Sequence, residues 1–113
     1  LVGSEMCISD SYVPTDNIAA SNTEAIANVT VPAKTPVIAG EEGICKGCGV
    51  ATLSISYYDL GMTTGKMAAK ILTGEADIST MPIEFTTATP KYNASMCETL
   101  GITPLEGYTA IAE

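Results

Sequence analysis

The sequence VATLSISYYDLG, residues 50–61, contains the clearest change from strand to helix in the chain. Apolar and hydroxyl-bearing residues alternate from Ala51 onward, which predicts a strand over Val50–Ser56 with one polar face. Asp59 is then a suitable N-cap for a helix that ends at Gly74. One side of this predicted helix carries Leu60, Met67, Ala68, Ile71 and Leu72.

A similar strand-to-helix change precedes it. Ile8–Val13 is predicted to form a short strand that stops at Pro14, because proline disfavours helix in the preceding residue and lacks an N–H donor. Asp16 follows as an N-cap, and apolar residues at helical spacing predict a helix from there to about Val29.

The remaining elements are shorter. Val37–Ala39 is an apolar run that stops at Gly40, as a buried strand would, and the Gly-rich residues 41–49 are predicted to form a loop. Alternation over residues 83–86 predicts a last strand. Pro90 and Gly101 frame a final helix in the usual Pro-first, Gly-last order. Its predicted buried positions are Tyr92, Met96 and Leu100.

This order of elements predicts the fold class. Strands and helices alternate along most of the chain, which is typical of an α/β fold with a largely parallel sheet. The length of 113 residues suits one compact domain, and the apolar fraction of 46% is enough for a hydrophobic core.

Charge and composition exclude several functions. The formal net charge is -8, and no Lys/Arg cluster offsets it, so nucleic acid and anionic membranes are unfavourable partners. The chain has no His, which removes the commonest general base and metal ligand. No apolar run is long enough to span a bilayer. The chain begins at Leu1 with no leader, from which we expect a processed or truncated product.

Polar side chains follow the predicted strands, where parallel sheets bind ligands. Thr15-Asp16-Asn17 offers a hydroxyl, a carboxylate and an amide that suit a ligand with ammonium or hydroxyl donors, although a helix cap would explain Asp16 alone. Glu41 and Glu42 could bind an ammonium, remain solvated or act as an acid/base pair. Tyr57 and Tyr58 could stack on a ligand or pack as core residues.

The cysteines have several interpretations. Cys45 and Cys48 form a CxxC pair, which could be redox-active or supply two zinc ligands, with Cys7 and Cys97 completing a four-cysteine site. The predicted loop is the wrong context for a redox motif, which favours free thiols or one structural disulfide.

Five segments together resemble a known family. They are Tyr12–Asn17 (YVPTDN), Pro36–Gly43 (PVIAGEEG), Ala51–Gly61 (ATLSISYYDLG), Thr64–Ala68 (TGKMA) and Ile71–Asp77 (ILTGEAD). In order and spacing they are similar to the C-terminal part of the ABC-transporter substrate-binding proteins of the tryptophan/tyrosine-uptake type, which have the type I periplasmic-binding-protein fold. Versions from Gram-positive bacteria, which are surface lipoproteins, are the most similar.

The resemblance implies a binding protein without a cofactor rather than an enzyme. A full member has two lobes that close on a small solute, here an aromatic or related amino acid, and then deliver it to a membrane ABC permease. By resemblance, residues 1–50 and 81–113 belong to the C-terminal lobe, and the strand and helix of residues 51–78 belong to the N-terminal lobe. The ligand-facing positions match Thr15, Asp16, Asn17, Glu41, Ser56 and Tyr57.

The chain also departs from the family. Many relatives have Asp where this chain has Ser56, which weakens a predicted salt bridge to the ligand there. The family typically has an apolar residue and Gly in place of Cys45 and Cys48, so the CxxC is not a family motif.

Other possibilities remain open from the sequence. A ligand-sensing regulatory domain of the same fold would carry an attached DNA-binding or signalling domain, and this chain contains none. A cysteine-based redox or metal protein is a further alternative. Because the chain resembles only the last third of a full member, we also expect it to expose apolar faces and self-associate.

Overall fold

The computed structural model describes residues 10–112. Within them the chain forms two compact units. The first unit combines the residues up to Ser54 with those from Pro90 onward, and the second unit consists of residues 55–89.

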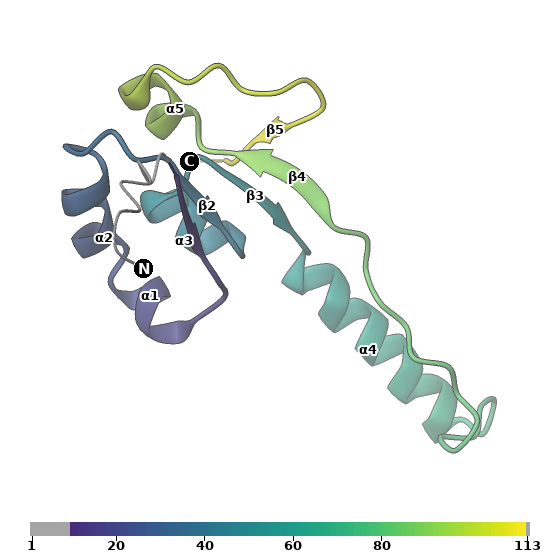
Figure 1. Cartoon of the computed structure of the whole chain (residues 1–113). Helices are drawn as coiled ribbons and strands as arrows, with labels where there is room; N and C mark the ends of the chain where they lie inside the picture. Colours follow the sequence, from purple (N-terminus) through teal and green to yellow (C-terminus); the bar gives the residue numbers. More distant parts are fainter. Residues whose placement is uncertain (1–9, 113) are drawn as a thin grey trace, which may run out of the picture. The chain divides into compact units, whose positions relative to one another are not determined.

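A five-stranded sheet has the order β1-β2-β3-β4-β5 (Figure 1). The strands are β1 (Ser11–Val13), β2 (Val37–Ala39), β3 (Ala51–Ser54), β4 (Thr89–Tyr92) and β5 (Thr109–Ala110). The pairs β1–β2, β2–β3 and β4–β5 are parallel, whereas the arrows of β3 and β4 run in opposite directions. The predicted α/β fold with a largely parallel sheet is confirmed. The residues of the first predicted strand before Asp10 lie outside the described part.

The predicted helix from Asp16 to about Val29 is two helices, α1 (Asn17–Ser21) and α2 (Thr23–Thr30). Asn22 separates them with φ of -129°. Its backbone N–H donates to the Ala19 carbonyl oxygen at 3.0 Å, and its side-chain Nδ2 donates to the Ile18 carbonyl oxygen at 2.8 Å. Asn22 thus closes the last turn of α1, as local side-chain bonds of Asn often do.

The loop predicted over residues 41–49 is wrong, because Glu42–Cys48 form the helix α3. Glu41 caps this helix, accepting hydrogen bonds from the backbone N–H groups of Gly43 and Ile44. Burial of one helix face explains why the segment folds despite its glycines, since tertiary packing overrides weak propensity. Ile44 is fully buried on that face.

The hydrophobic core lies between the sheet and these helices. Its fully enclosed members are Val37, Ala39, Ile44, Cys45 and Cys48, with Val13, Ala19, Ile26, Ala27 and Ile111 packed against them. The alternation predicted for β3 is present, but Thr52 and Ser54 point into the interior, whereas Leu53 is 64% exposed. The polar face of this strand is therefore the buried one.

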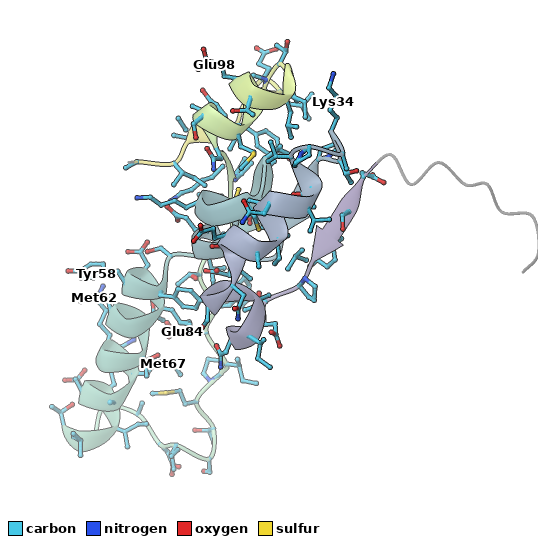
Figure 2. The ribbon with its side chains drawn as sticks, turned by 90° about the vertical axis from the view of Figure 1, so that its left-hand side faces the viewer. Lys34, Tyr58, Met62, Met67, Glu84 and Glu98 are labelled. Atoms are coloured by element: carbon cyan, nitrogen blue, oxygen red, sulfur yellow. The ribbon has the colours of Figure 1, made fainter. Side chains whose placement is uncertain are left out.

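The second unit contains α4 (Tyr57–Leu72). Ser56, rather than the predicted Asp59, is its N-cap and accepts a hydrogen bond from the Asp59 backbone N–H. The helix ends before Gly74, whose φ of 78° is the left-handed conformation predicted for that position. In Figure 2, Tyr58 and Met62 project from the same side of α4. No helix in the described range is both long and apolar enough to cross a membrane.

The strand predicted over residues 83–86 is wrong, since these residues have no regular secondary structure. Ile83 and Phe85 are 92% and 86% exposed. Their alternating side chains therefore pack against neither a neighbouring strand nor a core, and such packing is what stabilises a strand. The strand forms instead at Thr89–Tyr92, and it takes the place of the first turn predicted for the last helix.

That last helix, α5 (Ala94–Leu100), is therefore shorter than predicted. Asn93 caps its start, and Gly101 ends it with φ of 69°, as expected for a C-terminal glycine. Cys97 is its buried residue, while Met96 and Leu100 are half-buried and Tyr92 is half-buried on β4.

Candidate functional site at the carboxyl ends of the strands

The turns that follow β1 and β2 lie against each other. Val13 pairs with Ala39 at the ends of the two strands, and the Gly40 backbone N–H donates to the Val13 carbonyl oxygen at 2.8 Å. The Thr15 hydroxyl then donates to the Gly40 carbonyl oxygen at 3.2 Å. A Cβ on Gly40 would lie 2.7 Å from the Thr15 backbone nitrogen, so this close approach requires glycine. The structure thereby brings Thr15, Asp16, Asn17 and Glu41 to one edge of the sheet.

Asp16 is the N-cap of α1, as predicted. Its Oδ1 accepts hydrogen bonds from the backbone N–H groups of Ile18 and Ala19, each at 2.8 Å. Within residues 10–112, neither its other oxygen, Oδ2, nor the side-chain amide of Asn17 forms a hydrogen bond. Both residues are exposed. Asp16 can therefore cap the helix with one oxygen and present the other to a ligand.

The two acidic residues after β2 are both partly exposed and make separate contacts. Both carboxylate oxygens of Glu41 accept backbone N–H bonds, from Gly43 at 2.9 Å and from Ile44 at 2.5 Å. Glu42 forms a salt bridge with Lys91, with Oε2 and Nζ 2.6 Å apart. Glu41 has less free acceptor capacity for a ligand than Asp16.

Ser56 and Tyr57 belong to the second unit. The Ser56 hydroxyl oxygen accepts the capping bond at the start of α4, from the Asp59 backbone N–H at 3.2 Å. Tyr57 and Tyr58 are 60% and 77% exposed, so neither is a core residue in this structure. Their rings are available for contacts with another surface or a ligand.

The cysteines of the described part are buried thiols. Cys45, Cys48 and Cys97 are free and buried, and no group of three or more His, Cys, Asp or Glu residues there is arranged to hold a metal ion. Burial, followed by the nearby thiols and glutamates, raises the pKa of Cys45 to about 12. Burial also raises the pKa of Cys48 and of Cys97. Such thiols are poor nucleophiles at neutral pH. Cys7 lies outside the described residues.

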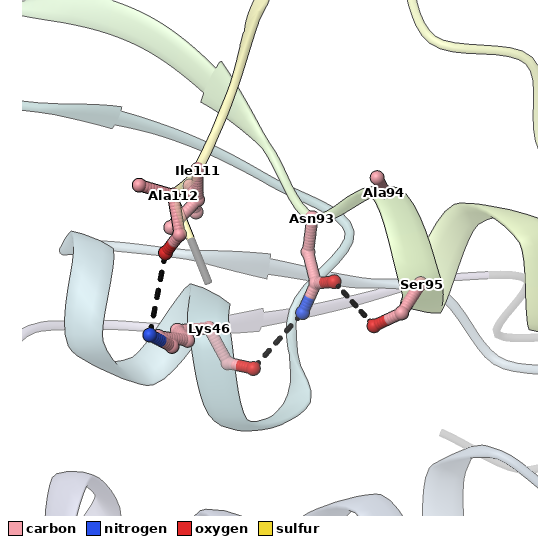
Figure 3. Close-up of a pocket in the computed structure, with 6 residues that line it drawn as sticks. All are labelled: Lys46, Asn93, Ala94, Ser95, Ile111 and Ala112. Carbon is pink, nitrogen blue, oxygen red and sulfur yellow. Dashed lines mark hydrogen bonds between the residues drawn. The ribbon is translucent and has the colours of Figure 1, made fainter.

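A small pocket of about 170 Å³ lies where α3, the start of α5 and the C-terminal segment meet (Figure 3). Asn93 organises it by donating to the carbonyl oxygens of Cys45 and Lys46, at 3.0 and 2.9 Å, and by accepting from the Ser95 hydroxyl at 2.9 Å. The Lys46 Nζ donates to the Ala112 carbonyl oxygen at 3.2 Å. These polar groups form hydrogen bonds with one another, and the bonds hold α3, the start of α5 and the C-terminal segment together.

Sequence reasoning did not identify Asn93 or Lys91. Asn93 could have been noticed as an Asn just before an apolar helical segment, which is a cap signal. Nothing in the sequence near Lys91 indicates its partner Glu42, which lies 49 residues earlier.

A parallel sheet with polar capping turns at the carboxyl ends of neighbouring strands is typical of α/β proteins that bind small molecules at that edge. The chain belongs to the family of ABC transporter substrate-binding proteins, whose sequence profile matches residues 7–113.

Individual relatives support this assignment. A tyrosine-binding protein of Clostridioides difficile is 37% identical over 65 residues, which is 58% of this chain and 19% of that protein. The ligand-free, open structure of a substrate-binding protein with adhesive properties from Clostridium difficile is 33% identical, with a TM-score of 0.73, over 90% of this chain and 35% of that one.

A second solved structure, an ABC domain from Streptococcus pneumoniae in complex with L-Trp, is 28% identical with a TM-score of 0.75. The likeness covers 94% of this chain and 38% of that chain. The chain thus spans little more than a third of the solved structures that it matches.

Proposed function

We propose that this chain is part of the solute-binding component of an ABC importer, and that the solute is an aromatic or related amino acid. The family assignment supports the class of protein. The tyrosine-binding relative and the neighbour in complex with L-Trp support the class of solute. We further propose that the protein has no catalytic activity and needs no cofactor.

The proposed protein has two lobes, of which this chain supplies a part. The family resemblance assigns residues 1–50 and 81–113 to the C-terminal lobe and residues 51–78 to the N-terminal lobe. Because β3 pairs with β2 in the first unit, we propose that the part belonging to the N-terminal lobe begins after Ser54. Residues 55–89 form a second compact unit, and the chain then returns to the first unit. This path supports the proposal that the chain leaves one lobe and comes back to it. Ligand binding between the lobes shifts the balance between open and closed forms.

The single observation that carries the proposed site is the contact between the turns after β1 and β2, through Thr15 and Gly40. It supports a site in which Asp16, Asn17 and Glu41 share the edge of the sheet after β1 and β2. A carboxylate and an amide suit the α-ammonium and carboxylate of an amino acid. Ser56 and Tyr57 complete the proposed set, with the Tyr57 ring stacking on the aromatic side chain of the solute.

The proposed partners and location follow from this role. A substrate-binding protein delivers its solute to permease subunits in the membrane, and it works outside the cytoplasm. We propose a surface lipoprotein of a Gram-positive bacterium. The acidic surface, with a formal net charge of -8, makes nucleic acid an unfavourable partner.

The test is calorimetric titration of the complete two-lobed protein, expressed from the gene that encodes this chain, with a panel of amino acids. We expect binding heat with L-tyrosine, L-tryptophan or L-phenylalanine and little with aspartate or lysine. Absence of heat with every aromatic amino acid would contradict the proposed solute. Heat with another small solute would retain the binding function and correct its specificity.

A further inference from the structure

The salt bridge between Lys91 and Glu42 joins β4 to the start of α3, next to Glu41. Its atoms Nζ and Oε2 are 2.6 Å apart, and the two side chains are 28% and 36% exposed. The chain has 13 acidic residues and only 5 basic ones, so only a minority of the carboxylates can each pair with a separate basic residue. The position of this one lysine is therefore informative.

Glu42 lies beside a proposed ligand contact. It is the first residue of α3, and the preceding residue, Glu41, is the N-cap of that helix. Lys91 lies on β4 and is the second residue of the segment that returns to the first unit, which begins at Pro90. The salt bridge therefore ties the strand that returns from the second unit to the turn that carries Glu41.

Charge is the important property of this contact. Asp16, Glu41 and Glu42 bring carboxylates to the turns after β1 and β2, whereas an amino acid ligand carries a carboxylate as well as an ammonium. An unpaired Glu42 would repel the ligand carboxylate and compete with Asp16 for the ligand ammonium, and partial burial would leave both effects less screened than in open solvent. Lys91 cancels this charge.

We propose that Lys91 is a positioning residue for solute binding, which acts by neutralising Glu42 beside the ligand-binding turn. The inference rests on the proposed function. It predicts that removal of the lysine alone leaves an uncompensated carboxylate beside the turn, whereas removal of both groups leaves no charge there.

The experiment compares dissociation constants for L-tyrosine and L-tryptophan in the complete protein and its variants. We expect Lys91→Met to weaken binding roughly threefold, a size typical of a partly exposed ion pair. The double variant Lys91→Met with Glu42→Gln should bind as the wild type does, and Lys91→Arg should retain affinity. The loss in Lys91→Met should shrink at high salt.

A matched control separates this effect from a change in overall charge. Lys34→Met removes the same charge from the same unit, but Lys34 precedes β2 and lies at the opposite end of that strand from Glu41. It should not change affinity. Lys91→Gln removes the charge with a smaller side chain and replaces Lys91→Met if that variant does not fold.

The possible results are distinct. Unchanged affinity in Lys91→Met would overturn the inference, and so would an equal loss in Lys91→Met and the double variant, which indicates a purely structural contact. A wild-type protein that binds no amino acid would instead contradict the proposed function.

Discussion

The carboxylate of Asp16 accepts two backbone N–H bonds at the start of α1 through a single oxygen. The local sequence at this position favours a helix cap, whereas the family resemblance favours a ligand contact. The structure makes the two compatible, because Oδ2 accepts no bond within the described residues. The cap and the proposed ligand contact can therefore be tested separately.

The cap is tested by stability. Asp16→Ala should lower the free energy of unfolding by about 1 kcal/mol, since two N–H groups lose their acceptor. Asp16→Asn should leave it nearly unchanged, because Asn is an equally good N-cap. Urea denaturation of both variants measures this difference. An equal loss in the two variants would show that the charge, rather than the capping oxygen, stabilises the start of α1.

The buried thiols predict a loss of stability at alkaline pH. Burial, with the neighbouring thiols and glutamates, raises the pKa of Cys45 from 9.0 to about 12. A raised folded-state pKa gives stability that is complete below the unfolded value and is lost as the pH rises through the folded value. The free energy of unfolding should therefore fall between about pH 9 and about pH 12.

Urea denaturation at a series of pH values across this range measures the loss, and Cys45→Ala is the control. That variant should be less stable at neutral pH because of the cavity, but its stability should depend less on alkaline pH. An identical pH dependence in Cys45→Ala and the wild type would rule out Cys45 as the source.

At the scale of elements, most of the strands and helices were predictable from the sequence, and the errors have physical reasons. The helix α3 was missed because its glycines indicate a loop, whereas its stability comes from burial of Ile44 and from the cap by Glu41. The strand predicted at residues 83–86 has no sheet neighbour, while Thr89–Tyr92 pairs with one. Both errors concern tertiary contacts that a local pattern does not contain.

In the candidate site, too, local features were predictable from the sequence and tertiary contacts were not. Thr15, Asp16 and Glu41 were predicted at strand ends, and the structure gathers them at one edge. The partner of Glu42 could not be predicted, because the contact with Lys91 depends on how β4 returns to the sheet.

Glycines in two helices provide a matched comparison of packing and propensity. A Cβ on Gly47 of α3 would clash with the side chain of Thr23 at the start of α2, whereas a Cβ on Gly65 of α4 would have nothing within 4 Å. Gly47→Ala should therefore destabilise the protein by about 1–3 kcal/mol through overpacking. Gly65→Ala should stabilise it by up to about 1 kcal/mol through helix propensity.

Thermal and urea unfolding of the two variants check this prediction. A stabilised Gly47→Ala variant would show that α2 and α3 are not packed as closely as the structure indicates.

At the scale of the whole molecule, large apolar side chains remain exposed in both units. They include Tyr12, Ile38 and Leu53 on the sheet, Tyr58, Met62 and Leu72 on α4, and Ile78, Ile83 and Phe85 after it. Exposed apolar residues in this number favour association. The isolated chain of residues 1–113 should therefore self-associate at micromolar concentration.

Light scattering measures this association directly. The mass should exceed the 11.6 kDa of one chain, and replacing Ile83 and Phe85 with Ser should lower it. A monomeric mass at micromolar concentration would contradict the prediction.

The central claim is that the capping turn at Asp16 also contacts the solute. Its most direct test is the dissociation constant of the Asp16→Asn variant of the complete protein for the aromatic amino acid that the wild type binds. Because Asn preserves the cap and removes only the charge, we predict unchanged stability and roughly tenfold weaker binding, the effect of losing one charged hydrogen bond. Equal affinity in the variant and the wild type would contradict the claim and leave Asp16 as a helix cap alone.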